Sequence, residues 1–277
     1  MKKIISIATI ALIGSALSGC QSQSASNQGQ SHTDINQDTL IKTGKLNKTK
    51  TPLYGAEIYS HNKIKFGKFV MRMKMVSSPG VISSFFTYDN ESWQGGIPWR
   101  EIDIEVVGKQ PDQLQTNLIT GNSTKRIHSE TIHNIQNLDQ FHEFTLIWTP
   151  DEITWKVDGK VIHTETAATS KQVIDMRDSP QSYRMNLWIS EAIEWAGLFN
   201  TKNLPLYQYV DWIEYHSFNN GDFNLEWRDD FNSFNEKRWG KGDWSFDGNL
   251  VTFSQDNIAI RNGMLVLGLT NNQTGIN

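Results

Sequence analysis

Apolar and polar residues alternate in short segments along most of the chain from about residue 53 onwards. Alternation with a period of two is typical of β-strands that bury one face, and the longer period of an amphipathic helix is almost absent. Turn-forming residues separate the segments, as at Asp158-Gly159 within the run from Trp155 to Val161. The pattern predicts an all-β sandwich. Its strands are expected at residues 54–60, 64–76, 80–88, 100–107, 113–119, 142–149, 152–157, 183–189 and 207–217.

Two long segments lack this alternation, residues 89–99 and residues 190–206. Loops of this length inside a domain usually carry function, so both are expected to border a site. After Asn219-Asn220-Gly221 the alternation resumes and continues to about residue 270. A run of about 48 residues is small for an independent domain without disulfides or metal. The run 223–270 is therefore expected to complete the sandwich.

The N-terminal segment, residues 1–20, has a different pattern. Two lysines precede an apolar run from Ile4 to Leu17, which is typical of a secretory signal and too short to span a bilayer. Small residues lead into Cys20, which resembles a bacterial lipoprotein box; a plain signal peptide is the alternative. Because Gln21 follows the cysteine, resemblance to known sorting rules indicates an outer-membrane lipoprotein of the bacterial cell envelope, and otherwise a secreted protein.

Composition bounds the remaining organisation. Residues 21–51 are polar and are expected to form a disordered tether, followed by one domain at 52–271 and a tail at 272–277. The net charge of -4 and the lack of a long basic run argue against a nucleic-acid surface. Ten Trp residues indicate either core or sugar-stacking surface, and composition does not separate the two. The single cysteine excludes a disulfide within the chain.

The clearest chemical feature is the run from Glu101 to Glu105, in which three acidic residues alternate with Ile102 and Ile104. On a strand, the carboxylates of Glu101, Asp103 and Glu105 share one face. The Cα atoms of Glu101 and Glu105 are expected roughly 13 Å apart, and if the side chains lean together their carboxyls approach to about 5–6 Å. Retaining glycoside hydrolysis requires this separation between a nucleophile and an acid/base, and the spacing fits either order of the two residues.

The same alternation would also suit the solvent-facing side of an antiparallel sheet. However, three like charges on one strand face repel each other, and no basic residue shares that face because Arg100 points to the other side. Crowded carboxylates raise one another's pKa, so one Glu is expected to stay protonated near neutral pH. The repulsion therefore favours a catalytic site over a solvated strand face.

The segment from Trp99 to Lys109 resembles the active-site strand of glycoside hydrolase family 16, and in particular of its lichenases, the bacterial 1,3-1,4-β-D-glucanases. The C-terminal run departs from the lichenase order, since residues 244–249 and 263–269 resemble segments that ordinarily open a lichenase. Over about residues 52–271 the chain therefore resembles the naturally circularly permuted form. Other segments that resemble lichenases, in the expected order, are 68–74, 81–88, 141–144, 186–188 and 209–212.

The resemblance implies a concanavalin A-like β-jelly-roll sandwich, circularly permuted, with strands of the N-terminal type at 223–271. By position, Glu101 would be the nucleophile, Glu105 the acid/base, and Asp103 the residue that tunes the pair. It also implies a structural Ca²⁺ held by Asp211, Asp230 and the backbone carbonyl of Gly263, and no cofactor for catalysis. The substrate-binding residues implied are Glu57, Phe86, Tyr88, Asn90, Trp99, Gln115, Asn117, Asn186, Trp188, Trp195 and Trp244.

The function expected from the resemblance is endo hydrolysis of mixed-linkage 1,3-1,4-β-D-glucan with retention of the β configuration. Two alternatives stay open: the same chemistry on laminarin or a marine galactan, and a non-catalytic glucan-binding surface lipoprotein. The expected partners are the polysaccharide substrate and a membrane that is contacted only through the N-terminal lipid. The protein is expected to be a monomer that binds no nucleic acid.

Overall fold

The computed structural model describes residues 52–272 and 275–276 of the 277-residue chain. The signal peptide expected at residues 1–20, with Cys20, and the tether expected at 21–51 lie outside the described residues. The described part forms two predominantly antiparallel β-sheets that pack face to face as a jelly-roll sandwich. The predicted all-β class is confirmed.

The first sheet carries the acidic strand, β4, in its interior. Its strands run in the order β14-β1-β11-β3-β4-β5-β6, with β15 paired to β1 and β7 paired to β5. Their bounds are β1 (Tyr54–Ser60), β3 (Val81–Tyr88), β4 (Glu101–Val107), β5 (Gln113–Asn122), β6 (Lys125–His128), β7 (Thr131–Asn134), β11 (Ser182–Ile189), β14 (Trp239–Lys241) and β15 (Thr252–Phe253).

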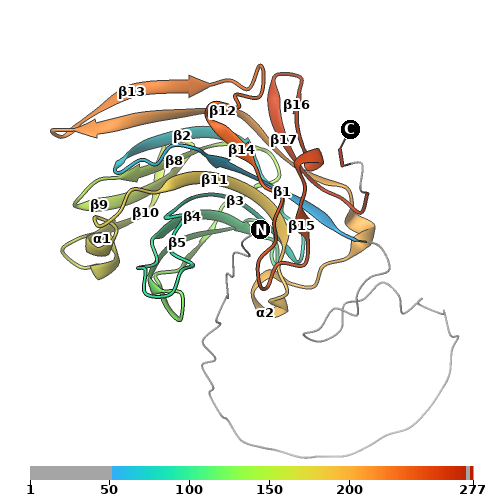
Figure 1. Ribbon diagram of the computed structural model, residues 1–277, viewed down its shortest axis with the longest axis horizontal. Helices are drawn as coiled ribbons and strands as arrows, with labels where there is room; N and C mark the ends of the chain where they lie inside the picture. The colour runs from blue at the N-terminus through green and yellow to red at the C-terminus, as the bar shows by residue number, and fades with distance from the viewer. Residues whose placement is uncertain (1–51, 273–274, 277) are drawn as a thin grey trace, which may run out of the picture.

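The second sheet covers the inner face of the first. Its order is β10-β9-β8-β2-β12-β17-β16, with β13 paired to β12. Figure 1 shows both sheets curved and layered, with β12, β2 and β8 in one layer and β11, β3 and β4 in the other. The bounds are β2 (Gly67–Lys74), β8 (Phe141–Trp148), β9 (Glu152–Val157), β10 (Lys160–Thr166), β12 (Leu206–Asn219), β13 (Asp222–Asp229), β16 (Ile258–Arg261) and β17 (Met264–Leu269).

Helices are few and short in the described residues, as the sequence predicts. They are α1 (Lys171–Asp175), α2 (Ile193–Ala196) and two 3₁₀ turns at Thr201–Asn203 and Gln255–Asn257. The predicted loop at 89–99 contains turns, bends and one isolated β-bridge between Pro98 and Asn122, and the predicted loop at 190–206 contains α2 and one of the 3₁₀ turns.

The core lies between the two sheets and fixes the position of β4. Ile102 and Ile104 are at most 1% exposed and point into this core, which places the alternating acids on the opposite face. Trp155 of β9, in the other sheet, donates its Nε1–H to the backbone oxygen of Asp103 at 3.0 Å. The acidic strand is therefore held from behind by apolar packing and by a hydrogen bond that joins the two sheets.

The C-terminal run contributes strands to both sheets. β14 pairs with β1 in the first sheet, and β17 pairs with β12 in the second. The turn predicted at Asp158-Gly159 is also present, because both residues have positive φ and join β9 to β10.

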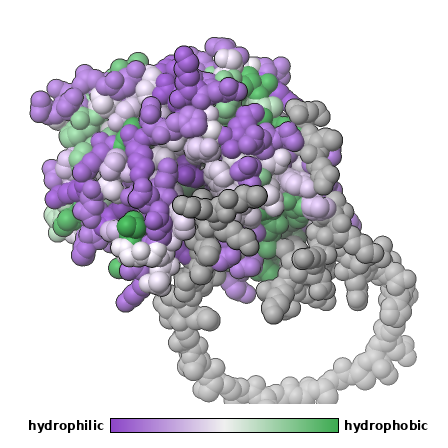
Figure 2. Space-filling model, in the orientation of Figure 1, coloured by the Kyte–Doolittle hydropathy of each residue, from purple (hydrophilic) through white to green (hydrophobic). Residues whose placement is uncertain are grey.

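The face shown in Figure 2 is largely hydrophilic, with hydrophobic residues in small separate patches. The large apolar side chains that are exposed in the described residues are likewise scattered over several elements. In the part of the chain that the structure describes, no helix is long and apolar enough to cross a membrane.

Candidate active site

Strand β4 lies between β3 and β5, so each acidic side chain has a neighbour on both sides. The acids project from the sheet face that is turned away from the core, where the sheet is concave and open. Their neighbours in register are Tyr88 and Ile119 for Glu101, Phe86 and Asn117 for Asp103, and Ser84 and Gln115 for Glu105.

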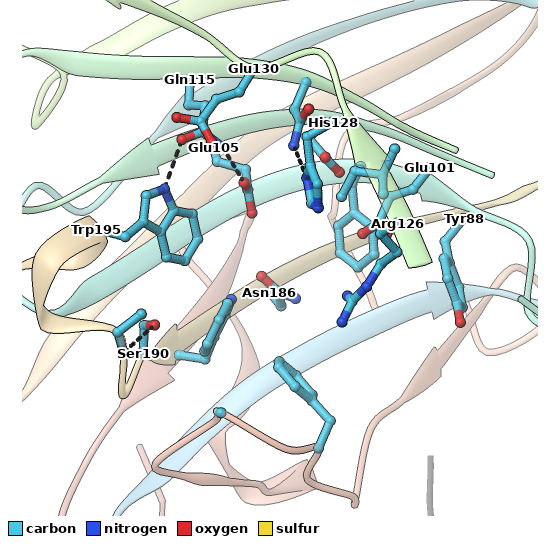
Figure 3. Close-up of a pocket in the computed structure, with 18 of the residues that line it drawn as sticks. Tyr88, Glu101, Glu105, Gln115, Arg126, His128, Glu130, Asn186, Ser190 and Trp195 are labelled. Carbon is cyan, nitrogen blue, oxygen red and sulfur yellow. Dashed lines mark hydrogen bonds between the residues drawn. The ribbon is translucent and has the colours of Figure 1, made fainter. Parts of the chain in front are cut away.

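A cleft of about 890 Å³ lies above these three acids. Figure 3 shows side chains from several strands of the sheet pointing into it. A space of this size is large enough for a bound organic ligand or a short segment of a polymer. The predicted residues that line the cleft are Glu57, Phe86, Tyr88, Trp99, Glu101, Asp103, Glu105, Gln115, Asn117, Asn186, Trp188, Trp195 and Trp244.

Asn90 is the one predicted substrate residue outside this lining. Its Oδ1 atom accepts hydrogen bonds from Ser182 Oγ at 2.5 Å and from Arg184 Nη2 at 2.8 Å. In this structure Asn90 therefore holds an arginine of the cleft in place instead of facing the cleft itself.

Asp103 occupies the most enclosed position of the three acids. Its side chain is 2% exposed, and among the described residues its Oδ2 atom has no hydrogen-bond partner. Burial raises the pKa of Asp103 well above its usual range, and the charges of Glu101 and Glu105 raise it further. Protonation of Asp103 therefore depends on the charge of its two neighbours in the row of acids.

Glu101 has the more polar surroundings of the two glutamates. Trp99 donates its Nε1–H to Glu101 Oε2 at 2.6 Å. Burial raises the pKa of Glu101 to about 7, while the Trp99 hydrogen bond and the charges of Arg126 and Arg184 act to lower it. Each of these contacts favours the ionised form of Glu101.

Glu105 lies in a more acidic environment. Its carboxylate accepts one long hydrogen bond, 3.3 Å from Gln115 Nε2. Burial raises the pKa of Glu105 to about 8, and the charges of Glu101 and Glu130 add to this increase. The surroundings therefore favour a protonated Glu105 beside an ionised Glu101, an asymmetry that the sequence alternation alone does not contain.

Glu57 and Arg184 form a buried ion pair at the Glu101 end of the cleft. Their side chains are 3% and 9% exposed, and Arg184 Nη1 donates to Glu57 Oε1. The guanidinium lies 5.4 Å from the ring centroid of Tyr88 and 5.8 Å from that of Trp244. The pair ties β1 to β11 and gives the floor of the cleft a fixed polar surface.

Aromatic rings line another part of the cleft. The rings of Trp188 and Phe246 meet edge to face with centroids 4.9 Å apart, and Trp195 lies 6.3 Å from Trp188. Trp195 also donates its Nε1–H to Gln115 Oε1 at 2.9 Å. Flat rings set among amide and carboxylate groups are typical of a pyranose-binding surface.

Comparison with known proteins agrees with this geometry. The model of "Glycosyl hydrolases family 16" matches residues 20–214, which is more than half of the chain. This chain belongs to glycosyl hydrolases family 16. A relative named "Beta-glucanase" from Fibrobacter succinogenes is 42% identical over 225 residues, which cover 78% of this chain and 63% of that protein. The chain thus spans less than two thirds of that relative's length.

Two further relatives extend the family comparison. A "Beta-glucanase" from Paenibacillus macerans is 32% identical over 188 residues, covering 67% of this chain and 74% of that one. The solved structure "Crh5 transglycosylase in complex with NAG" is 25% identical, with a TM-score of 0.51 over 68% of this chain and 82% of that chain.

Several residues of this family 16 cleft were missed by the sequence analysis. Arg126, His128 and Glu130 enter the cleft from the edge of the sheet, at β6 and the residues that follow it, and Arg184 enters from β11. The expectation that no basic residue faces the acids holds for β4 itself, but Arg126 and Arg184 bring positive charge from neighbouring strands. The sequence signal that could have located β6 is the spacing of Arg126 and His128, because residues two apart lie on the same face of a strand.

Of the residues predicted to hold calcium, Asp211 lies on β12, while Asp230 follows β13 and Gly263 precedes β17, all outside the cleft lining. The strand register brings the three predicted ligands near one another. Val210, beside Asp211, pairs with Leu265, which is two residues after Gly263, and Ile213 pairs with Asp229, which precedes Asp230. Asp211 Oδ2 accepts from Arg72 Nη1 at 2.6 Å, and Asp230 Oδ1 accepts from Arg228 Nε at 2.7 Å. Gly263 has a φ of 69°. The described residues contain no cluster of three or more His, Cys, Asp or Glu side chains placed to hold a metal.

Proposed function

We propose that this protein is an endo-acting β-glucanase that hydrolyses mixed-linkage 1,3-1,4-β-D-glucan with retention of configuration. The observation that carries the proposal is the row Glu101, Asp103 and Glu105, which lies in an open cleft and whose two glutamates have unlike surroundings. The names of the two β-glucanase relatives support a glucan as the substrate.

In the first step the Glu101 carboxylate attacks the anomeric carbon, and the bond to the glycosidic oxygen breaks. Glu105 gives its proton to that oxygen, so the leaving sugar departs as an alcohol. The Trp99 N–H that binds Glu101 Oε2 orients the attacking carboxylate. The product of this step is a glycosyl ester on Glu101.

In the second step Glu105, now ionised, removes a proton from a water molecule. The resulting hydroxide attacks the anomeric carbon from the face that the leaving group vacated, and Glu101 leaves as a carboxylate. Two inversions give net retention. Asp103 lies between the two glutamates, and its buried, unpaired oxygen makes it the group that exchanges a proton with them during the cycle.

The substrate test compares three polymers. Wild type is expected to release reducing sugar from lichenan, with a fall in viscosity that shows internal cleavage and an initial β anomer in the proton NMR spectrum. Release of reducing sugar from laminarin or agarose, with none from lichenan, would reject mixed-linkage glucan as the substrate. The retaining hydrolysis by Glu101 and Glu105 would still stand. If wild type and Glu101→Gln are equally inactive on all three polymers yet bind them alike, the protein is a glucan-binding module.

We also propose that Asp211, Asp230 and the Gly263 carbonyl bind a Ca²⁺ that stabilises the fold. Three oxygen donors of this kind suit the ion, although the arginines now paired with both carboxylates have to turn away. When bound, the ion would neutralise the two carboxylates and tie β12 to the turns after β13 and before β17.

Calcium removal is the corresponding prediction. With Ca²⁺ at about 100 times its Kd the unfolding free energy is expected to be about 2.7 kcal/mol higher than in EDTA, seen as a higher Tm. Asp211→Asn should remove most of this difference, and Asp139→Asn, at an exposed site, should keep it. Equal melting of wild type in Ca²⁺ and in EDTA would reject the site.

The N-terminal signals support a lipid anchor at Cys20 in the outer membrane. Labelling with a radioactive fatty acid in a bacterial host, compared between wild type and Cys20→Ala, tests this assignment. Label that persists in Cys20→Ala would exclude it.

A further inference from the structure

Arg126 is held against Trp99 by the local backbone. The Trp99 N–H donates to the Gly121 carbonyl at 2.8 Å, and Gly121 pairs in register with Arg126. A Cβ at Gly121 would lie 2.2 Å from the Lys125 carbonyl, so glycine allows β6 to approach this closely. The Arg126 guanidinium carbon lies 4.5 Å from the centroid of the Trp99 ring.

The Trp99 side chain therefore contacts both the Arg126 cation and the Glu101 carboxylate. Trp99 is 2% exposed, and its Nε1–H donates to Glu101 Oε2 at 2.6 Å. Figure 3 shows Arg126 reaching from β6 into the pocket beside Glu101. A cation over the face of an indole draws electron density from the ring, which strengthens the N–H as a donor.

Two cations, Arg126 and Arg184, favour the ionised form of Glu101. Arg184 is the second cation that favours the ionised form of Glu101, but its charge is already matched by the buried Glu57 carboxylate. Glu57 itself disfavours that form. The titratable or charged groups that interact with Glu101 from all packed elements are Glu57 on β1, Tyr88 on β3, Asp103 and Glu105 on β4, Arg126 on β6 and Arg184 on β11.

We propose that Arg126 is a positioning residue of the glycosidase site, acting on Glu101 through the Trp99 ring and through its own charge to keep that carboxylate ionised and aimed. This inference rests on the proposed function only in treating Glu101 as the nucleophile. It gives a role to the arginine that reaches the cleft from β6, separate from that of Arg184, which is paired with Glu57.

The sign of the effect follows from the required protonation states. A nucleophilic Glu101 must be deprotonated, so its pKa sets the acidic limb of the pH dependence of kcat/KM. Burial raises that pKa and Arg126 lowers it. Loss of the cation therefore moves the acidic limb to higher pH and leaves the enzyme least impaired on the alkaline side of that limb.

The experiment measures kcat/KM against pH on lichenan for wild type, Arg126→Gln, Arg126→Lys and Lys125→Gln. Arg126→Gln is expected to shift the acidic limb upward by roughly 0.5–1 pH unit, with a loss of roughly 3- to 10-fold below the limb. Arg126→Lys keeps the charge and should stay within a few tenths of a unit of wild type. Lys125→Gln removes the same charge from the neighbouring exposed residue, and its limb should not move.

An unchanged limb in Arg126→Gln, or an equal shift in Lys125→Gln, would overturn the proposal. A direct titration separates this outcome from failure of the proposed function. In protein labelled with ¹³C at the Glu carboxyl carbons, with Glu101→Gln to assign the signal, the apparent pKa of Glu101 should rise in folded Arg126→Gln. If wild type cleaves no glucan, the proposed function fails, and the titration still decides whether Arg126 acts on Glu101.

Discussion

Replacing Glu101 with alanine is expected to lower kcat on lichenan by roughly 10⁴-fold or more, because the covalent path loses its nucleophile. The side chain lies in the cleft and contributes nothing to the apolar core, so the fold should be retained. An unchanged far-UV circular dichroism spectrum and melting curve would show this. Residual activity then reports only the remaining acid and the binding surface.

A small anion should restore part of this loss. Azide can enter the space that the carboxylate vacates and attack the anomeric carbon of an aryl β-glycoside with a good leaving group. Because the attack comes from the face that Glu101 occupied, the product is expected to be an α-glycosyl azide. Identification by NMR of the β-azide instead, or full activity of Glu101→Ala without azide, would show that Glu101 is not the nucleophile.

Strands such as β2 were predictable because they carry an alternating pattern with one buried face. On β4 the alternation correctly predicted that Ile102 and Ile104 lie in the core and that the three acidic residues face the opposite side, where the cleft lies. The predicted segments also located β1, β3, β5 and β11, the strands that supply most of the cleft residues named in advance, although these strands are buried along most of their length on both faces. A period of two is a local property, and it needs no knowledge of which strands become neighbours.

The missed residues depend on pairing that is not local. β6 and β7 are four residues each and sit at the sheet edge, and because neither contains a fully buried residue, neither shows a clear pattern of apolar and polar positions. Arg126 and Arg184 reach Glu101 only because their strands join the same sheet as β4. The unlike surroundings of the two glutamates arise from these neighbours, and a symmetric pentapeptide does not contain them.

The resemblance-based assignments divide in a similar way. Family membership is established, and the cleft gathers every predicted substrate residue except Asn90. The roles of these residues, the calcium site and the circularly permuted strand order stay predictions. The family model ends at residue 214, and β14 to β17, which follow it, still add strands to both sheets.

Replacing Glu105 with alanine is expected to separate the two chemical steps. On lichenan, whose leaving group needs a proton, the rate should fall by roughly 10²- to 10⁴-fold. On a dinitrophenyl β-glycoside the first step needs no acid, so the glycosyl ester on Glu101 should form rapidly and accumulate, giving a burst of phenolate followed by a slow steady state.

The azide product again decides the role. In Glu105→Ala, azide should attack the accumulated ester from the face where Glu105 normally activates water, which yields a β-glycosyl azide and raises the steady-state rate. Gln115→Ala is the matched control, because it removes the hydrogen bond to Glu105 and keeps the carboxylate; it should show no burst and no azide product. An α-azide from Glu105→Ala would reverse the assignment of the two glutamates. The observed contacts oppose that reversal, because Trp99 and Arg126 support a negative charge at Glu101, whereas Glu130 opposes one at Glu105.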